Sequence, residues 1–329
     1  MTAISVGSLG GTIATRRQPG GGAATPALSA AALVEAAPGL AEIGPVRAET
    51  VRQVASPSLS FEDVLVARDW ALREVEAGAE GVVLTTGTDT LEEAAYLLDL
   101  FWEVEAPLVV TGAMRTADAP GADGPANLLG AARTAATAGS RGRGALVVFN
   151  DRIHAARWVA KRDALAVETF VSPDFGPLGR VVEGRPLFLH DGPRRRTLGA
   201  PRSAAHRVAL VPCALGLGTE ALEDAIASGR NAGIVVAGYG AGHVSAAEAR
   251  VIGAHAAALP IVVASRTGAG RTAAATYGFE GSETDLIAKG AWLAGWLPPA
   301  KARVLLWSVI ASGAPRETWR ERFEGAAAP

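Results

Sequence analysis

The chain has 329 residues, of which 49% are hydrophobic, so it is long and apolar enough for about two domains with buried cores. Its 31 Lys and Arg nearly balance its 33 Asp and Glu, and a net charge of -2 leaves no excess of positive charge to bind nucleic acid or an anionic membrane surface. The longest uncharged stretch, 231–247, contains four glycines and several polar side chains, which excludes a membrane span there.

The start of the chain and its cysteine content bear on the compartment. The first charged residue is Arg16, whereas a signal peptide begins with basic residues, so we expect a cytoplasmic protein unless a leader has been removed. The single cysteine, Cys213, excludes an intrachain disulfide and a multi-thiolate metal site. Because Cys213 lies within an apolar run, we expect a buried structural thiol.

Short apolar runs alternate with helical patterns, which predicts an α/β fold with a mostly parallel sheet. Ser60 and Asp63 have the spacing at which two side chains cap each other's backbone N–H groups, so a helix is expected to begin there. A second helix, 90–100, follows Asp89 and has apolar residues at helical spacing. In this part of the chain the expected strands are 3–8, 81–85, 107–111 and 144–149.

The segment 191–207 is rich in Pro, Gly and Arg and is predicted to be a linker, with Arg194–Arg196 as a solvated face. We therefore expect a larger N-terminal domain at 1–190 and a smaller C-terminal α/β domain at 208–329. In the second domain the expected strands are 208–211, 233–237 and 260–264, and the expected helices are 219–228, 245–258, 298–311 and 317–323.

Candidate site residues are the polar side chains that directly follow predicted strands, because ligands bind beyond the carboxyl ends of parallel strands. Thr12 follows Gly10 and Gly11, and Thr88 precedes Asp89 between a strand and a helix. Alone, each threonine is typical of a structural turn or helix cap. Lys161 is one of only three lysines, and a desolvated lysine, unlike an arginine, can act as a base.

The motifs that the sequence lacks and those that it contains limit the chemistry that these residues can carry out. The phosphate loop, the His-Glu-x-x-His zinc helix and the Gly-x-Ser-x-Gly elbow are absent from the sequence. The motifs that are present include Gly10-Gly11-Thr12-Ile13-Ala14, Thr86-Gly87-Thr88-Asp89-Thr90, Gly112-Ala113-Met114-Arg115, Asp123-Gly124-Pro125 with Asn127, and Lys301-Ala302-Arg303-Val304-Leu305-Leu306. In this order they resemble the motifs of bacterial L-asparaginases, the asparaginase/glutaminase family. The resemblance extends over almost the whole chain, and its first two motifs together are highly specific.

The resemblance implies an amidohydrolase that converts L-asparagine to L-aspartate and ammonia without a metal or other cofactor. It implies that Thr12 is the nucleophile, that Thr88 is a second catalytic threonine, and that Asp89 and Lys161 are their acid and lysine partners. Ser56 then holds the α-carboxylate of the substrate and Asp89 its α-ammonium group, while N–H groups near Thr88 and Ala113 face the oxyanion. The implied substrate-binding residues are Gly11, Ser56, Pro57, Gly87, Ala113 and His243.

The sequence departs from the family pattern in the segment after Gly-Gly-Thr, where the family commonly has a tyrosine. No tyrosine occurs in the first 95 residues. We hypothesise that Tyr277 of a neighbouring subunit supplies the phenol as a catalytic group; the alternative is a core tyrosine. The segment 15–25 contains three consecutive glycines and is expected to be a mobile lid.

Two further departures concern the substrate pocket. Pro57 stands where many secretory members have a glutamine, which removes one amide contact and leaves the preference between asparagine and glutamine open. The segment 238–245 replaces the glycine-rich stretch that reaches the partner's pocket; we interpret His243 as structural or supporting, with a catalytic base as the alternative.

The resemblance also implies that the active site forms between subunits of a homodimer or homotetramer. Two alternatives to an asparaginase remain. One is a glutaminase or a deamidase of another small amide, and the other is an inactive amino-acid-binding sensor.

Overall fold

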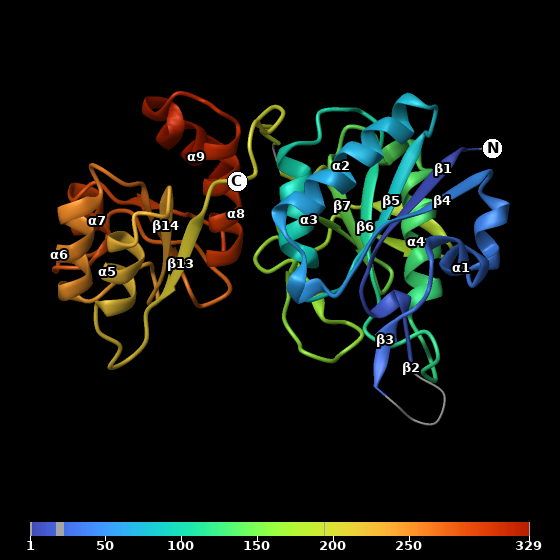
Figure 1. Ribbon diagram of the computed structural model, residues 1–329, viewed down its shortest axis with the longest axis horizontal. Coiled ribbons are helices and arrows are strands. Elements are labelled where there is room, and N and C mark those ends of the chain that lie inside the picture. The colour runs from blue at the N-terminus through green and yellow to red at the C-terminus, as the bar shows by residue number, and fades with distance from the viewer. Residues whose placement is uncertain (1, 18–22, 194, 329) are drawn as a thin grey trace. The chain divides into compact units, whose positions relative to one another are not determined.

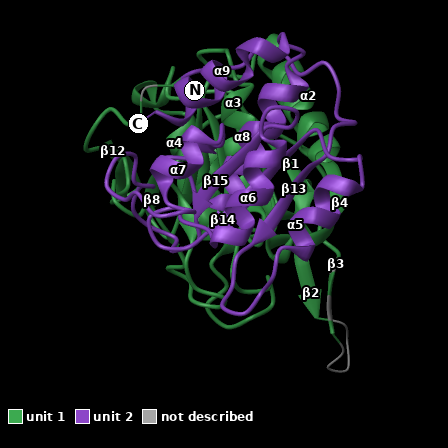
Figure 2. Ribbon diagram, turned by 90° about the vertical axis from the view of Figure 1, so that its left-hand side faces the viewer, with its two compact units in different colours: residues 1–195 green, residues 196–329 purple. Residues whose placement is uncertain are grey.

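The computed structural model describes residues 2–17, 23–193 and 195–328, and these form two compact units, 1–195 and 196–329 (Figures 1 and 2). The boundary between the units falls inside the predicted linker at 191–207. Each unit has its own sheet and its own apolar core. No helix of the described residues is long and apolar enough to cross a membrane.

The sheet of unit 1 has eight strands in the order β12-β11-β8-β7-β6-β5-β1-β4. Its five neighbouring strands from β4 to β7 are parallel, whereas β8, β11 and β12 pair antiparallel at one edge. The predicted α/β class with a mostly parallel sheet is therefore confirmed. The strands are β4 (Val46–Val54), β1 (Ile4–Gly10), β5 (Gly81–Thr85), β6 (Leu108–Thr111), β7 (Ala145–Phe149), β8 (Arg152–Ala155), β11 (Gly179–Val182) and β12 (Arg185–Phe188).

Four helices cover the two faces of this sheet, α2 (Phe61–Glu76) and α3 (Leu91–Leu100) on one face and α1 (Ala30–Glu35) and α4 (Gly124–Ala135) on the other (Figure 1). The predicted reciprocal cap at the start of α2 is present: Ser60 Oγ accepts the Asp63 N–H at 3.1 Å, and Asp63 Oδ2 accepts the Ser60 N–H at 3.0 Å. Two short antiparallel pairs lie outside the main sheet, namely β2 (Thr15–Arg17) with β3 (Ala24–Pro26) and β9 (Ala160–Lys161) with β10 (Phe170–Val171).

The predicted lid 15–25 coincides in part with the β2–β3 pair, and its three glycines lie outside the described residues.

The prediction that Arg194–Arg196 form a solvated face of the linker is wrong at Arg195, whose Nε lies 2.9 Å from Asp99 Oδ1. The same guanidinium donates to the carbonyl oxygen of Trp102 at 2.7 Å, because the end of α3 leaves backbone acceptors there. Arg194 lies outside the described residues.

Unit 2 contains a four-stranded parallel sheet in the order β13-β14-β15-β16, with α8 on one face and α5 and α6 on the other. Cys213 follows β13 and is 1% exposed, which confirms the predicted buried thiol. Its burial raises the pKa of the thiol, and Glu248 Oε1 lies 3.1 Å from its Sγ atom. The elements are β13 (Val208–Pro212), α5 (Glu220–Ala227), β14 (Gly233–Gly238), α6 (Ala246–His255), β15 (Ile261–Ser265), α7 (Glu283–Ala288), β16 (Trp292–Leu293), α8 (Pro299–Ala311) and α9 (Trp319–Ala327).

Candidate active site

The loops after β1 and β5 touch at two glycines. Gly11 has φ +83°, and a Cβ atom at this position would lie 2.2 Å from the backbone N of Gly87. A side chain on Gly11 would thus be strained and would force the two loops apart. Because β1 and β5 are parallel neighbours, their carboxyl ends meet at one edge of the sheet. This contact brings Thr12, at the start of a short 3-10 turn, to the same edge as the segment that holds Thr88 and Asp89.

Lys161 joins the two polar side chains that follow β5. Its Nζ atom donates to Thr88 Oγ1 at 2.9 Å and to Asp89 Oδ1 at 2.8 Å. The hydrogen bond from Lys161 lowers the pKa of Asp89, although partial burial opposes that shift. Thr88 is 4% exposed, whereas the Asp89 side chain is 55% exposed and so accessible to a ligand. The structure therefore brings Lys161 to two residues that precede it in the sequence by more than 70 positions.

Ser56 lies on the other side of the Asp89 carboxylate. Its hydroxyl donates to Asp89 Oδ2 at 3.1 Å, and its carbonyl oxygen accepts a hydrogen bond from Thr90 at 3.1 Å. Gly87 permits this approach, because a Cβ atom there would lie 2.5 Å from Ser56 Oγ. Pro57 follows in an exposed 3-10 turn. The predicted residues Gly11, Ser56, Gly87 and Asp89 thus form one contiguous group of contacts.

A second network fixes the loop that carries Ala113. The Asp123 carboxylate accepts the backbone N–H groups of Met114 at 3.0 Å and Arg115 at 2.9 Å. Asn127 donates from Nδ2 to Asp123 Oδ2 and to the Gly112 carbonyl oxygen, both at 3.0 Å. Sequence reasoning placed Asp123 and Asn127 in a motif but gave them no role. They hold the loop at the carboxyl end of β6, in which Gly112 and Ala113 are buried.

Tyr277 and His243 lie together in unit 2. Their rings meet edge to face with centroids 4.9 Å apart, and Tyr277 is 46% exposed. The alternative of a core tyrosine is therefore wrong. Glu283, which sequence reasoning missed, is fully buried; its Oε1 atom accepts the Tyr277 N–H at 2.7 Å and its Oε2 atom lies 3.1 Å from His243 Nε2. Burial opposes ionisation of Glu283, but these and neighbouring hydrogen bonds lower its pKa. A supporting position for His243 is consistent with these contacts.

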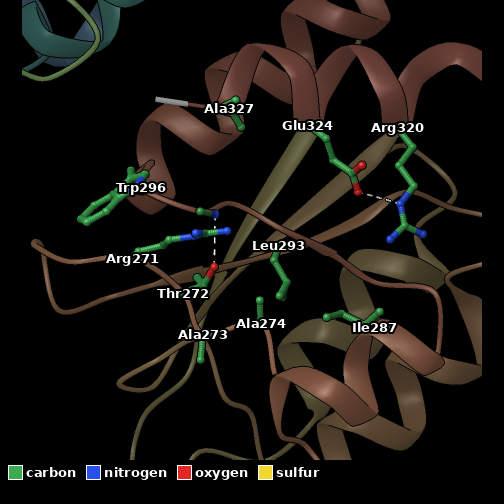
Figure 3. A pocket seen from close by; sticks show the side chains of 12 residues that line it. Arg271, Thr272, Ala273, Ala274, Ile287, Leu293, Trp296, Arg320, Glu324 and Ala327 are labelled. Atoms are coloured by element: carbon green, nitrogen blue, oxygen red, sulfur yellow. Dashed lines mark hydrogen bonds and ion pairs between the residues drawn. The ribbon is translucent and has the colours of Figure 1, made fainter. Parts of the chain in front are cut away.

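Unit 2 also has an open pocket of about 330 Å³ between α9, β16 and the segment before Tyr277 (Figure 3). An ion pair of 2.8 Å between Arg320 and Glu324 stands at its edge. None of the predicted site residues lines this pocket, so we do not assign it to the reaction. Within the described part of the chain, no cluster of three or more His, Cys, Asp or Glu side chains could hold a metal ion.

Comparison with known proteins places these motifs in one family. The family model described as "Asparaginase, N-terminal" matches residues 3–194, and the model described as "Glutaminase/Asparaginase C-terminal domain" matches residues 207–323. The chain is 33% identical to a "Probable L-asparaginase periplasmic" of Haemophilus influenzae over 98% of this chain and 92% of that protein. It is 38% identical to a "Glutaminase-asparaginase" of Pseudomonas fluorescens over 65% of this chain and 60% of that protein.

A solved structure gives the same result for the fold. The crystal structure of a "Probable Cytoplasmic L-asparaginase" from Campylobacter jejuni superposes with a TM-score of 0.87 at 31% sequence identity, covering 98% of this chain and 99% of that one. Sequence and fold agree over nearly the full length of both proteins. The chain therefore belongs to the asparaginase family, as its motifs predict.

Proposed function

We propose that this protein is an L-asparaginase that hydrolyses the side-chain amide of L-asparagine to L-aspartate and ammonia. The observation that carries the proposal is the contact of Lys161 Nζ with both Thr88 and Asp89, next to the edge where Thr12 begins its turn. A threonine hydroxyl is a weak nucleophile until a neighbouring group accepts its proton. Two hydroxyls and a carboxylate at the ends of two adjacent strands, with a lysine from β9, meet that need.

In the proposed reaction, the Thr12 hydroxyl attacks the carboxamide carbon and its proton is transferred to the leaving nitrogen, which departs as ammonia. Thr88 and Lys161 relay protons during this step, and Asp89 stabilises the lysine. Water then attacks the acyl-threonine ester, which releases L-aspartate and restores the Thr12 hydroxyl. Backbone N–H groups near Thr88 and Ala113 stabilise the oxyanion of each tetrahedral intermediate. Each step uses groups of the protein and water.

Substrate orientation follows from the same group of residues. Ser56 binds the α-carboxylate of the substrate, and Asp89 binds the α-ammonium group. Gly11, Gly87 and Ala113 supply backbone surface that a larger side chain would block, as the close approach of Gly11 to Gly87 illustrates. Pro57 has no side-chain amide, so it lines the pocket without forming a side-chain hydrogen bond to the substrate.

The direct test is ammonia release from L-asparagine and L-glutamine by the purified protein, with Thr12→Ala as the control. We expect turnover of asparagine that the substitution reduces by at least about a thousandfold. Undiminished turnover by the variant would contradict the role of Thr12. Turnover of neither amide by the wild type would favour an amino-acid-binding sensor, which titration calorimetry with aspartate would then examine.

A glutaminase, or an enzyme that deamidates another small amide, is the second candidate. The similarity to a protein named glutaminase-asparaginase favours it, and Pro57 leaves the preference between the two amides open. The ratio of kcat/KM for asparagine and glutamine separates the two activities. A ratio below one would assign glutamine as the preferred substrate.

The proposed working unit is a homodimer or homotetramer in which Tyr277 and His243 of one subunit complete the site of another. Tyr277→Phe is expected to lower kcat, and unchanged kinetics would refute the participation of its phenol. A mixture of Thr12→Ala and Tyr277→Phe subunits should regain activity. In a mixed oligomer, a site that takes Thr12 from the Tyr277→Phe subunit and Tyr277 from the Thr12→Ala subunit contains both native residues. Light scattering gives the oligomeric state.

We propose a cytoplasmic location, in line with the cytoplasmic location ascribed to the similar Campylobacter jejuni protein, and cell fractionation tests it.

A further inference from the structure

The main chain of Lys161 is held by an acidic side chain from α3. The Lys161 N–H donates to Glu92 Oε2 at 2.5 Å, and Glu92 is the second residue of the helix that follows Thr88 and Asp89. Lys161 otherwise lies in β9, a strand of two residues that forms a two-stranded pair with β10. A strand this short offers little support of its own, so the Glu92 carboxylate is a principal anchor for the backbone at this point.

The contacts form a closed loop between two short segments. Glu92 accepts a hydrogen bond from the backbone of Lys161, and the side chain of Lys161 returns to Thr88 and Asp89, which lie four and three residues before Glu92. A lysine side chain has four rotatable bonds, and the position of its Nζ atom therefore depends on where its Cα atom is fixed. With both ends tied to the same segment, Nζ can reach Thr88 Oγ1 and Asp89 Oδ1 at once.

We propose that Glu92 is a positioning residue, which places the Lys161 ammonium group between Thr88 and Asp89. The inference rests on the proposed amide hydrolysis and adds a residue to it. The charge of Glu92 in the first turn of α3 also suits the helix dipole, and that purely structural effect must be distinguished from positioning. An acceptor of the right length is what positioning requires, whereas the dipole effect requires a negative charge.

Two substitutions separate these effects. Glu92→Gln removes the charge but keeps a side-chain oxygen that can accept the Lys161 N–H, and Glu92→Ala removes both. Glu62 is the matched control, because it is an exposed acidic residue in the first turn of α2. Glu62→Ala thus removes a charge from a comparable helix position away from Lys161.

With asparagine as substrate, Glu92→Ala is expected to lower kcat by about 10- to 100-fold with a smaller change in KM, because a displaced Nζ atom misaligns the relay. The acid limb of the kcat profile should move to higher pH in this variant, since the pKa of Asp89 rises when Lys161 no longer donates to it. Glu92→Gln should restore most of the lost activity, and Glu62→Ala should match the wild type. Equal losses in both Glu92 variants, or a wild-type profile in Glu92→Ala, would overturn the proposal.

Crystal structures of the wild type and Glu92→Ala give a readout that does not depend on activity. Displacement of Nζ from Thr88 and Asp89 in the variant supports positioning, and an unmoved Nζ atom refutes it. If Nζ is displaced but the wild type hydrolyses no amide, the positioning by Glu92 stands and the proposed function fails.

Discussion

Removal of the Asp123 carboxylate should both destabilise the protein and impair the site. Asp123 is 9% exposed and accepts hydrogen bonds from three donors, namely the backbone N–H groups of Met114 and Arg115 and Asn127 Nδ2. It also stands at the N-terminus of α4, where a negative charge is favourable. Asp123→Ala leaves all three donors without this acceptor.

The size of the effect follows from how well water can replace the carboxylate. Asn127 is 4% exposed, and its Nδ2 group keeps the Gly112 carbonyl oxygen but loses Asp123, so one buried N–H is left unsatisfied at a cost of about 2 kcal/mol. Met114 is half-buried and Arg115 is exposed, so water partly satisfies their N–H groups and each loss costs about 1 kcal/mol. With about 0.5 kcal/mol for the helix dipole, the total is about 4 to 5 kcal/mol. This is a large part of the stability of a typical domain.

Urea denaturation of the wild type and Asp123→Ala measures this loss, and kcat for asparagine measures the effect on the loop of Ala113. We expect kcat to fall by about 10- to 100-fold in the protein that remains folded, because Met114 loses its anchor and Asn127, which holds Gly112 on the other side of Ala113, loses one of its own. Asp118→Ala is the control in the same loop. Asp118 is exposed, and its contacts with the Thr116 side chain and the Arg17 N–H lie at the surface, so its loss should destabilise the protein far less than the loss of Asp123.

Asp123→Asn provides a second, milder perturbation. One oxygen remains for the two backbone donors, but the new amide nitrogen faces Asn127 Nδ2, so donor meets donor at 3.0 Å. The free energy of unfolding of Asp123→Asn should lie between that of the wild type and that of Asp123→Ala. A loss below about 1 kcal/mol in Asp123→Ala, together with wild-type kcat, would refute the anchoring role of this carboxylate.

Three further predictions follow from single contacts. Because Lys161 lowers the pKa of Asp89 below its ordinary 3.8, the pair stabilises the fold above that pH and ceases to do so as pH falls through the lowered value; urea denaturation should therefore show a deficit for Lys161→Met near pH 6 that shrinks as the pH falls below 3.8. Gly11→Ala should cost about 1–2 kcal/mol in backbone strain and abolish activity by moving Gly87, so wild-type kcat in this variant would contradict the close approach. Cys213 should react with a thiol reagent only after unfolding, because it is 1% exposed and burial raises its pKa; rapid labelling of the native protein would disprove this.

The central strands could be predicted from sequence because each is a buried apolar run bounded by turn residues. β5 was predicted with its observed bounds, and β7 begins one residue later than expected. The antiparallel edge was missed, since β8 has the sequence Arg-Ile-His-Ala and carries no continuous apolar signal. The turn before it held a usable signal: Asn150 and Asp151 have φ of +49° and +57°, and residues of this type favour the tight hairpin turn that joins β7 to β8.

Local pattern alone could not assemble the site. Thr88 and Asp89 follow a predicted strand, but Lys161 lies 73 residues beyond Thr88, and only the family resemblance connected them. Glu92 and Asp123 were not predicted as functional because each acts on a backbone N–H group that the fold brings near. Side-chain contacts to distant main chain leave no periodic signal in the sequence.

Asp89 links substrate binding to the proton relay through its two oxygens. Oδ2 accepts from Ser56, which is proposed to bind the substrate, and Oδ1 accepts from Lys161, which is proposed to act on the nucleophile through Thr88. For this reason a substitution at Asp89 must change KM and kcat together, whereas substitutions at Ser56 and Lys161 should act mainly on KM and on kcat, respectively.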